Sequence, residues 1–149
     1  MRWLGFVLFF VLAASCPAQF RTVEMTFQGV GCASCLESLP SRVQRLRGVE
    51  SATVDAKAGV LTVKLAEQNR VRVEQIRDFV EQDGTKATRA VVDVTGDVVE
   101  ENGRKVLHVG SATYELEGSA ASGRQTIHGQ IEDLKPASGV LRIRILAQR

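Results

Sequence analysis

The sequence predicts an α+β protein in two parts, in which an N-terminal half combines helices and strands and a C-terminal half holds short strands alone. Between residues 22 and 92, some segments repeat their apolar residues every two positions, which is typical of strands. Others repeat them about every 3.6 positions, which is typical of helices. After residue 93 the helical spacing disappears, and short alternating runs are separated by turn residues. The chain of 149 residues is long enough for two small domains.

A strand and a helix open the N-terminal half. Residues 22–30 alternate apolar and polar side chains, which predicts a half-buried strand. The following helix is predicted from an apolar stripe at intervals of three and four residues, formed by Leu36, Leu39, Val43 and Leu46. Gly48 stands where a glycine would cap the C-terminus of this helix. Pro40 lies inside the helix without an amide to donate, so it predicts a kink or a shifted first turn.

Two strands, a second helix and a final strand complete this half. Residues 49–56 and 60–67 predict a hairpin, with Gly59 in its turn. Residues 71–84 carry a helical stripe, and residues 85–94 predict a strand again. The order β-α-β-β-α-β allows two helices to cover one face of a four-stranded antiparallel sheet, the ferredoxin-like arrangement.

Residues 93–149 predict a small all-β domain. Short strand-like runs alternate with turn signals such as Asn102-Gly103. In the last run Leu141 and Ile143 would face one way and Arg142 the other. This many short strands in fewer than 60 residues predicts a barrel or a curled sheet, and we expect an OB-like barrel. No linker rich in proline, glycine or serine separates the halves, so we expect them to pack rigidly.

The first 18 residues predict a signal peptide. Arg2 precedes an apolar run that ends at Ala14 and is too short for a bilayer core, which needs about 20 residues. We expect cleavage after Ala18. The alternative is lipidation of Cys16, because residues 12–16 resemble a bacterial lipobox. In either case the mature protein would work in the periplasm or cell envelope, and it would meet the membrane only through this segment.

Composition and motifs argue against several classes of function. The formal net charge is +2 at pH 7, and the chain has a single Trp and a single Tyr, so nucleic-acid binding is not expected. No Ser-His-Asp order and no phosphate-binding glycine loop occurs, so catalysis is not expected either. His108 and His128 lie on predicted strands without the spacing of metal ligands.

Cys32 and Cys35 are the candidate functional residues. Cys32 would lie in the loop before the first helix and Cys35 in its first turn, where the helix dipole favours a thiolate. A disulfide, a redox pair, half of a zinc site and a two-thiolate clamp for a soft metal all fit this spacing. Structural zinc needs four ligands, and no second pair or Cys/His cluster completes them. A disulfide across so short a loop stabilises a fold little. The spacing therefore favours a functional role.

Four segments together resemble the heavy-metal-associated (HMA) domain: "GVGCASC", "CLESLPSRVQRLRGV", "VDAKAGVLTV" and "VEQIRDFVEQDG". The resemblance covers residues 22–92. This family includes copper chaperones, modules of copper-pumping P-type ATPases and the periplasmic mercury-binding protein. It implies that Cys32 and Cys35 bind Cu(I) or, as the second choice, Hg(II). It also implies transfer by thiolate exchange to cysteines of a partner, a P-type ATPase or another envelope metal-binding protein.

The sequence departs from the family pattern around the cysteines. Val30 replaces the usual methionine, Gly31 replaces a threonine, and Pro40 is atypical in the helix. Thr85 stands where copper chaperones carry lysine and ATPase modules carry tyrosine, and Lys86 follows one place late. If Lys86 reaches the loop, its charge would help to balance a bis-thiolate site. Two alternatives remain: a thiol-disulfide oxidoreductase, which the β-hairpin-helix order disfavours, and a degenerate HMA scaffold that only contacts other proteins.

Overall fold

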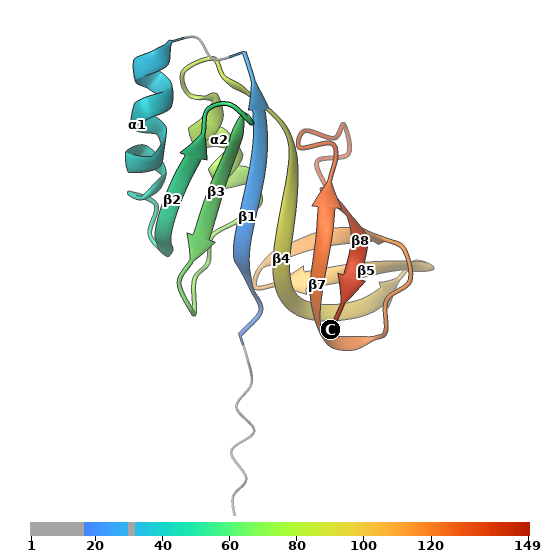
Figure 1. The fold of residues 1–149 in the computed structure, drawn as a ribbon. Helices are drawn as coiled ribbons and strands as arrows, with labels where there is room; N and C mark the ends of the chain where they lie inside the picture. Colours follow the sequence, from blue (N-terminus) through green and yellow to red (C-terminus); the bar gives the residue numbers. More distant parts are fainter. Residues whose placement is uncertain (1–16, 30–31) are drawn as a thin grey trace, which may run out of the picture.

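A computed structural model of the chain describes residues 17–29 and 32–149 (Figure 1). The predicted signal sequence up to residue 16, with the lipidation site Cys16, and the family departures Val30 and Gly31 lie outside the described residues. The elements are, in chain order, β1 (Gln19–Gln28), α1 (Ala33–Val43), β2 (Val49–Asp55), β3 (Val60–Leu65), α2 (Val73–Glu81), β4 (Lys86–Glu101), β5 (Arg104–Val109), β6 (Ala112–Glu117), β7 (Gly123–Ile131) and β8 (Arg142–Gln148).

The N-terminal half is an antiparallel sheet with strand order β2-β3-β1-β4, against which α1 and α2 pack (Figure 1). The βαββαβ order predicted for residues 22–92 is confirmed. The helical stripes that predicted both helices are buried: Leu39 and Val43 on α1, and Val73, Ile76 and Val80 on α2. The sheet and the two helices share one apolar core because their stripes face each other. No helix in the described ranges is long and apolar enough to cross a membrane.

Helix α1 is shorter than its apolar spacing predicts. It ends at Val43, and the backbone amide of Gln44 donates to the carbonyl of Pro40 at 2.9 Å. The prediction that Gly48 caps the helix is wrong. Gly48 lies in the loop that leads to β2, and its φ is 103°. A Cβ atom on Gly48 would lie 2.9 Å from Cβ of Asn69, so this loop needs glycine for space as well as for conformation.

Strand β4 belongs to both halves of the chain. Along one edge it pairs with β1 as far as Thr95, and from Asp97 onward it pairs with β5. Gly96 lies between these two pairings, and a Cβ there would lie 2.5 Å from the carbonyl oxygen of His108. A glycine inside a strand marks a tight bend where another backbone approaches closely. The predicted domain boundary at residues 92 and 93 therefore falls within a continuous strand, and the division into domains stays a prediction.

Five strands of the C-terminal half form a closed ring. The order is β4-β5-β6-β8-β7, and the ring closes because β7 pairs with residues 90–98 of β4 (Figure 1). The β6–β8 pairing is parallel, and the other pairings in the ring are antiparallel. The short strands expected after residue 93 are therefore present as β5 to β8.

Apolar and polar contacts join the ring to β1 and α2 of the N-terminal half. The rings of Phe20 on β1 and Tyr114 on β6 pack edge to face with centroids 5.4 Å apart. The Tyr114 hydroxyl donates to Oε2 of Glu74 on α2 at 3.2 Å. Nη1 of Arg77, also on α2, donates to the carbonyl oxygen of Leu134 in the β7–β8 loop at 2.6 Å. The two halves share one continuous core. The rigid packing expected from the missing linker stays a prediction.

Candidate metal centre

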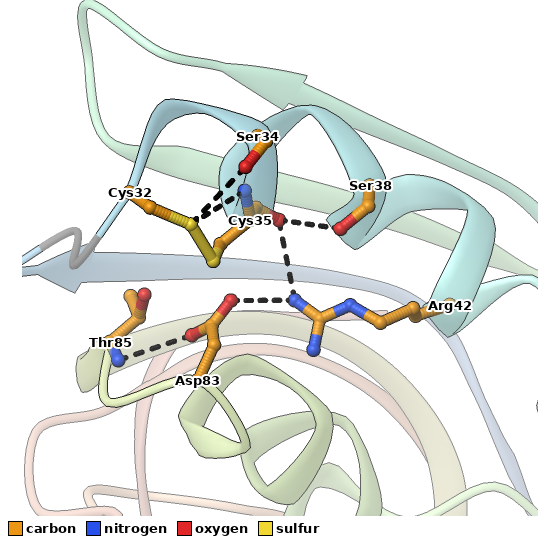
Figure 2. The surroundings of a disulfide bond; sticks show 7 residues. All are labelled: Cys32, Ser34, Cys35, Ser38, Arg42, Asp83 and Thr85. Carbon is orange, nitrogen blue, oxygen red and sulfur yellow. Dashed lines mark hydrogen bonds and ion pairs between the residues drawn. A yellow bond between two sulfur atoms is a disulfide. The ribbon is translucent and has the colours of Figure 1, made fainter.

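The cysteine pair lies where α1 begins, at the end of the sheet reached by the last residues of β1 (Figures 1 and 2). Cys32 is the N-cap residue, with extended backbone angles, and Cys35 lies in the first turn, as the sequence predicted. Their Cα atoms are 5.2 Å apart, and a disulfide joins the two side chains. Sequence and structure therefore agree on the location of the pair, and the structure holds it in the oxidised state.

Hydrogen-bond donors surround the sulfur of Cys32. The backbone amide of Cys35 donates to Sγ of Cys32 at 3.0 Å, in the manner of an N-cap side chain. The hydroxyl of Ser34 lies 3.5 Å from the same sulfur. The first turn of α1 carries no acidic residue. In the reduced protein these donors and the helix dipole would favour a thiolate over a thiol at this position.

Both cysteines are half-buried, and their neighbours Ala33 and Ser34 are exposed. Apolar residues of the core begin one turn later, at the partly buried Leu36 and the fully buried Leu39. Among the described residues, the pair therefore lies at the edge of the apolar core and not within it.

A second segment, the turn between α2 and β4, lies opposite the pair (Figure 2). Oδ1 of Asp83 accepts from the amide of Thr85 at 3.2 Å, and Oδ2 accepts from Nη2 of Arg42 at 2.7 Å. Burial opposes the ionisation of Asp83, but the hydrogen bonds from Thr85 and the charge of Arg42 outweigh it, so the pKa of Asp83 lies below its usual value of 3.8. The turn therefore carries an ionised carboxylate that is tied to α1.

Arg42 is the cation that contacts the cysteine segment. Its Nη2 atom also donates to the backbone carbonyl of Cys35 at 3.3 Å. Lys86, for which the sequence suggested a charge-balancing role, is exposed on β4 opposite Gln28 and forms no side-chain hydrogen bond or ion pair with the described residues. Arg42 follows Cys35 by seven residues, two turns along the same face of a helix, and this spacing is the signal that could have identified it.

No third ligand accompanies the cysteines in the described ranges. Within residues 17–29 and 32–149, no group of three or more His, Cys, Asp or Glu side chains is placed to hold a metal ion. Nε2 of His108 lies 2.7 Å from Glu101, and Nδ1 of His128 lies 2.7 Å from Asp93, so each histidine has a separate carboxylate partner. A four-ligand zinc site is therefore not formed by the described side chains.

Residues 24–88, which contain the cysteine pair, are similar to known proteins. The family model of the heavy-metal-associated domain matches residues 24–88. An uncharacterized protein of Haemophilus influenzae is 33% identical over 70 residues, which are 46% of this chain and 97% of the relative. The copper chaperone CopZ of Staphylococcus haemolyticus is 35% identical over 57 residues, which are 38% of this chain and 82% of the chaperone.

Two solved structures are similar to less than half of this chain. A CopZ metallochaperone has 26% sequence identity and a TM-score of 0.40, and covers 44% of this chain and 97% of its own. A copper binding domain from HMA7, a P-type ATPase, has 25% identity and a TM-score of 0.40, with coverages of 48% and 92%. The family match at residues 24–88 contains both cysteines, and relatives more than 30% identical are covered over most of their length. The chain therefore belongs to the heavy-metal-associated domain family.

Proposed function

We propose that this chain binds one soft metal ion, Cu(I) in the first place and Hg(II) in the second, through the sulfurs of Cys32 and Cys35. The observation that carries the proposal is that the two side chains meet at the solvent-accessible start of α1. Membership of the heavy-metal-associated family supports it, as does the relative of Staphylococcus haemolyticus that is named a copper chaperone.

The donor set suits a soft ion with low coordination number. Thiolates prefer Cu(I) over hard divalent cations, and two sulfurs satisfy a nearly linear ion. The disulfide and the metal complex exclude each other, because both use the same two sulfurs. The reduced pair is therefore the form that takes up the ion, and oxidation of Cys32 and Cys35 would close the site.

Transfer to a partner follows from the exposure of the pair. A thiolate of the partner would bond to the ion first, so that the ion briefly holds three sulfurs. One bond to this chain would then break, and a second thiolate of the partner would replace the remaining one. The ion keeps its oxidation state, and it is never released into solvent during the exchange. The partner is a protein with its own cysteine ligands, a P-type ATPase or another metal-binding protein of the envelope.

The proposal includes export and a role for the C-terminal half. Residues 1–18 are a signal peptide, so the mature chain acts in the periplasm or cell envelope and begins at Gln19 or at a lipid-bearing Cys16. Residues 93–149, which include the second half of β4, form an OB-like barrel. The ring order β4-β5-β6-β8-β7 with a parallel β6–β8 pair supports this description. Its contacts through Tyr114 and Leu134 hold α2 in place.

Competition for Cu(I) tests the metal site. The full chain is expressed, its exported form is purified and reduced without oxygen, and Cu(I) is titrated against a chromophoric chelator. We expect one Cu(I) per chain, and loss of competition in Cys32→Ser and in Cys35→Ser. Ser41→Ala is the matched control, because it changes an exposed serine of α1 that contacts neither sulfur. Equal competition by the double serine variant would reject the site.

One observation favours a second candidate function. Because the pair forms a disulfide here, a thiol-disulfide oxidoreductase remains the alternative. Such an enzyme would accelerate the reduction of insulin by a small dithiol, and the aggregation of the freed insulin chain would report it. Our proposal predicts the uncatalysed rate, both for the full chain and for Cys35→Ser. A clear acceleration by the full chain alone would favour the oxidoreductase.

A further inference from the structure

A single guanidinium group connects the backbone of Cys35 with the turn that follows α2. Nη2 of Arg42 donates to the carbonyl oxygen of Cys35 at 3.3 Å and to Oδ2 of Asp83 at 2.7 Å (Figure 2). The Arg42 and Asp83 side chains are 21% and 13% exposed, so water competes weakly for these bonds. The carboxylate is itself fixed, since its other oxygen accepts from the amide of Thr85. The first turn of α1 is therefore tied to the turn after α2.

The tie gains importance when the disulfide is reduced. In the oxidised chain the sulfur–sulfur bond restrains Cys35 relative to Cys32. Reduction removes this restraint, and the first turn of a helix is prone to fray. Among the described residues, the bonds of Arg42 are then the one hydrogen-bonded connection between the first turn of α1 and the segment from Asp83 to Thr85. Arg42 thus acts on the backbone that carries a metal-binding sulfur.

We propose that Arg42, held by Asp83, is a positioning residue for the soft metal: it fixes the backbone of Cys35 so that both sulfurs point to one ion. The inference rests on the proposed function. The role assigned to Arg42 differs from the one that the sequence suggested for Lys86. Lys86 was expected to balance charge, whereas Arg42 acts through geometry, since Asp83 compensates its own charge at 2.7 Å.

Substitution of Asp83 separates the two explanations. Asp83→Asn removes the carboxylate that holds Arg42 and leaves the positive charge uncompensated. If Arg42 balanced the charge of the thiolates, this variant would bind Cu(I) more tightly. If Arg42 positions Cys35, the variant binds more weakly, because the guanidinium loses its anchor. We expect the weaker binding.

The experiment measures Cu(I) affinity by chelator competition in the reduced full chain and in six variants. Groups that orient metal ligands typically contribute a factor of about 10 to 100 to metal affinity, so we expect a loss of that size in Arg42→Met and a loss in the same direction in Asp83→Asn. The double variant should lose no more than the larger single loss, because both changes break the same tie. Arg42→Lys should recover part of the affinity, since an ammonium can still reach one acceptor.

Two control variants exclude trivial causes. Arg45→Met removes the same charge from an exposed side chain that forms no ion pair with any described residue, and its affinity should stay within twofold of the unchanged chain. Ile76→Val loosens the fully buried core of α2 seven residues before Asp83, so it lowers the melting temperature without removing an atom of the tie. Its affinity should also stay within twofold. Equal affinity of Arg42→Met and Arg45→Met, or tighter binding by Asp83→Asn, would overturn the inference.

A metal-free measurement uses the same proteins. The reduced pair is equilibrated with oxidised glutathione, so that each disulfide formed in the protein releases two molecules of glutathione thiol. Because the tie holds the two sulfurs near each other, Arg42→Met should lower the equilibrium constant for disulfide formation at least threefold, and Arg45→Met should leave it unchanged. An unchanged or raised constant in Arg42→Met would refute the positioning role.

The two arms separate the two proposals. If the unchanged chain fails to compete for Cu(I), the proposed function fails, and the glutathione equilibrium still decides whether Arg42 positions Cys35. If the unchanged chain competes but Arg42→Met binds equally well, the metal site stands and the inference on Arg42 fails.

Discussion

The hydroxyl of Tyr114 connects the barrel to α2, and its removal is the clearest test of how the halves are joined. Tyr114 is fully buried, and its hydroxyl donates to Oε2 of Glu74 at 3.2 Å. Tyr114→Phe keeps the ring and its packing against Phe20 but removes this bond. Hydrogen bonds to charged groups contribute about 1.5 to 3 kcal/mol, and the length of this bond favours the lower end. We expect a loss of about 1.5 kcal/mol at pH 7, on the order of 5 °C in melting temperature for a chain of this size.

The same substitution has a defined pH dependence. Burial raises the pKa of Tyr114 above its usual value of 10.0, and the nearby Glu74 carboxylate raises it further. The hydroxyl stays protonated in the folded chain while it ionises in the unfolded chain, so its contribution is complete below pH 10 and declines above it. The decline is about 1.4 kcal/mol per pH unit. The advantage of tyrosine over phenylalanine should therefore vanish near pH 11.

Urea unfolding of both proteins at several pH values measures this effect. The disulfide form is used so that the cysteines do not titrate. Tyr114 is the only tyrosine of the chain, so the difference between the two proteins isolates this group from lysines that ionise in both. Glu74→Gln is the control that keeps an acceptor and removes the charge, and it should lose less stability than Tyr114→Phe. A constant difference between the proteins from pH 7 to pH 11 would refute the reasoning.

Two further predictions concern the bend of β4 and the anchor of Arg42. Gly96→Ala would place a methyl group 2.5 Å from the carbonyl of His108, and we expect the forced separation of β4 and β5 to destabilise the fold by about 1 to 3 kcal/mol in thermal unfolding; an unchanged melting temperature would contradict the bend. The lowered pKa of Asp83 means that its stabilisation is complete above pH 3.8 and is lost as the pH falls through the folded-state pKa. Asp83→Asn should therefore unfold with a weaker acid dependence, and parallel acid transitions in the two proteins would argue against the ion pair.

Much of the helical half could be predicted because its signals are local. The stripe of Val73, Ile76 and Val80 repeats within one helix, and all three side chains are fully buried. The cysteine pair is likewise a local feature, because Cys32 and Cys35 are only three positions apart in the sequence. The end of α1 was predicted too late because Leu46 continues the apolar spacing although it lies beyond the helix, where it packs against the core from a loop. Periodicity alone does not separate these two ways of burying a side chain.

The features that could not be predicted depend on residues distant in the sequence. Arg42 and Asp83 are 41 residues apart, and Tyr114 and Glu74 are 40 apart, so no local pattern pairs them. The full length of β4 was not predicted for the same reason: which strands lie beside residues 86–101 depends on how the ring closes. The bend at Gly96 could not be predicted from the neighbouring residues, because the need for glycine arises from the backbone of His108 on β5.

The continuity of β4 limits how this protein can be divided. A fragment cut after residue 92 would keep both cysteines and the whole of the matched family region, but it would lose β7, which pairs with β4 on the side opposite β1. The ring of Phe20 would also lose its cover by Tyr114. The cut would leave an unprotected row of backbone amides and carbonyls beside newly wetted apolar side chains, a combination that promotes aggregation. Poor solubility of such a fragment would therefore result from the position of the cut and not from the presence or absence of a metal.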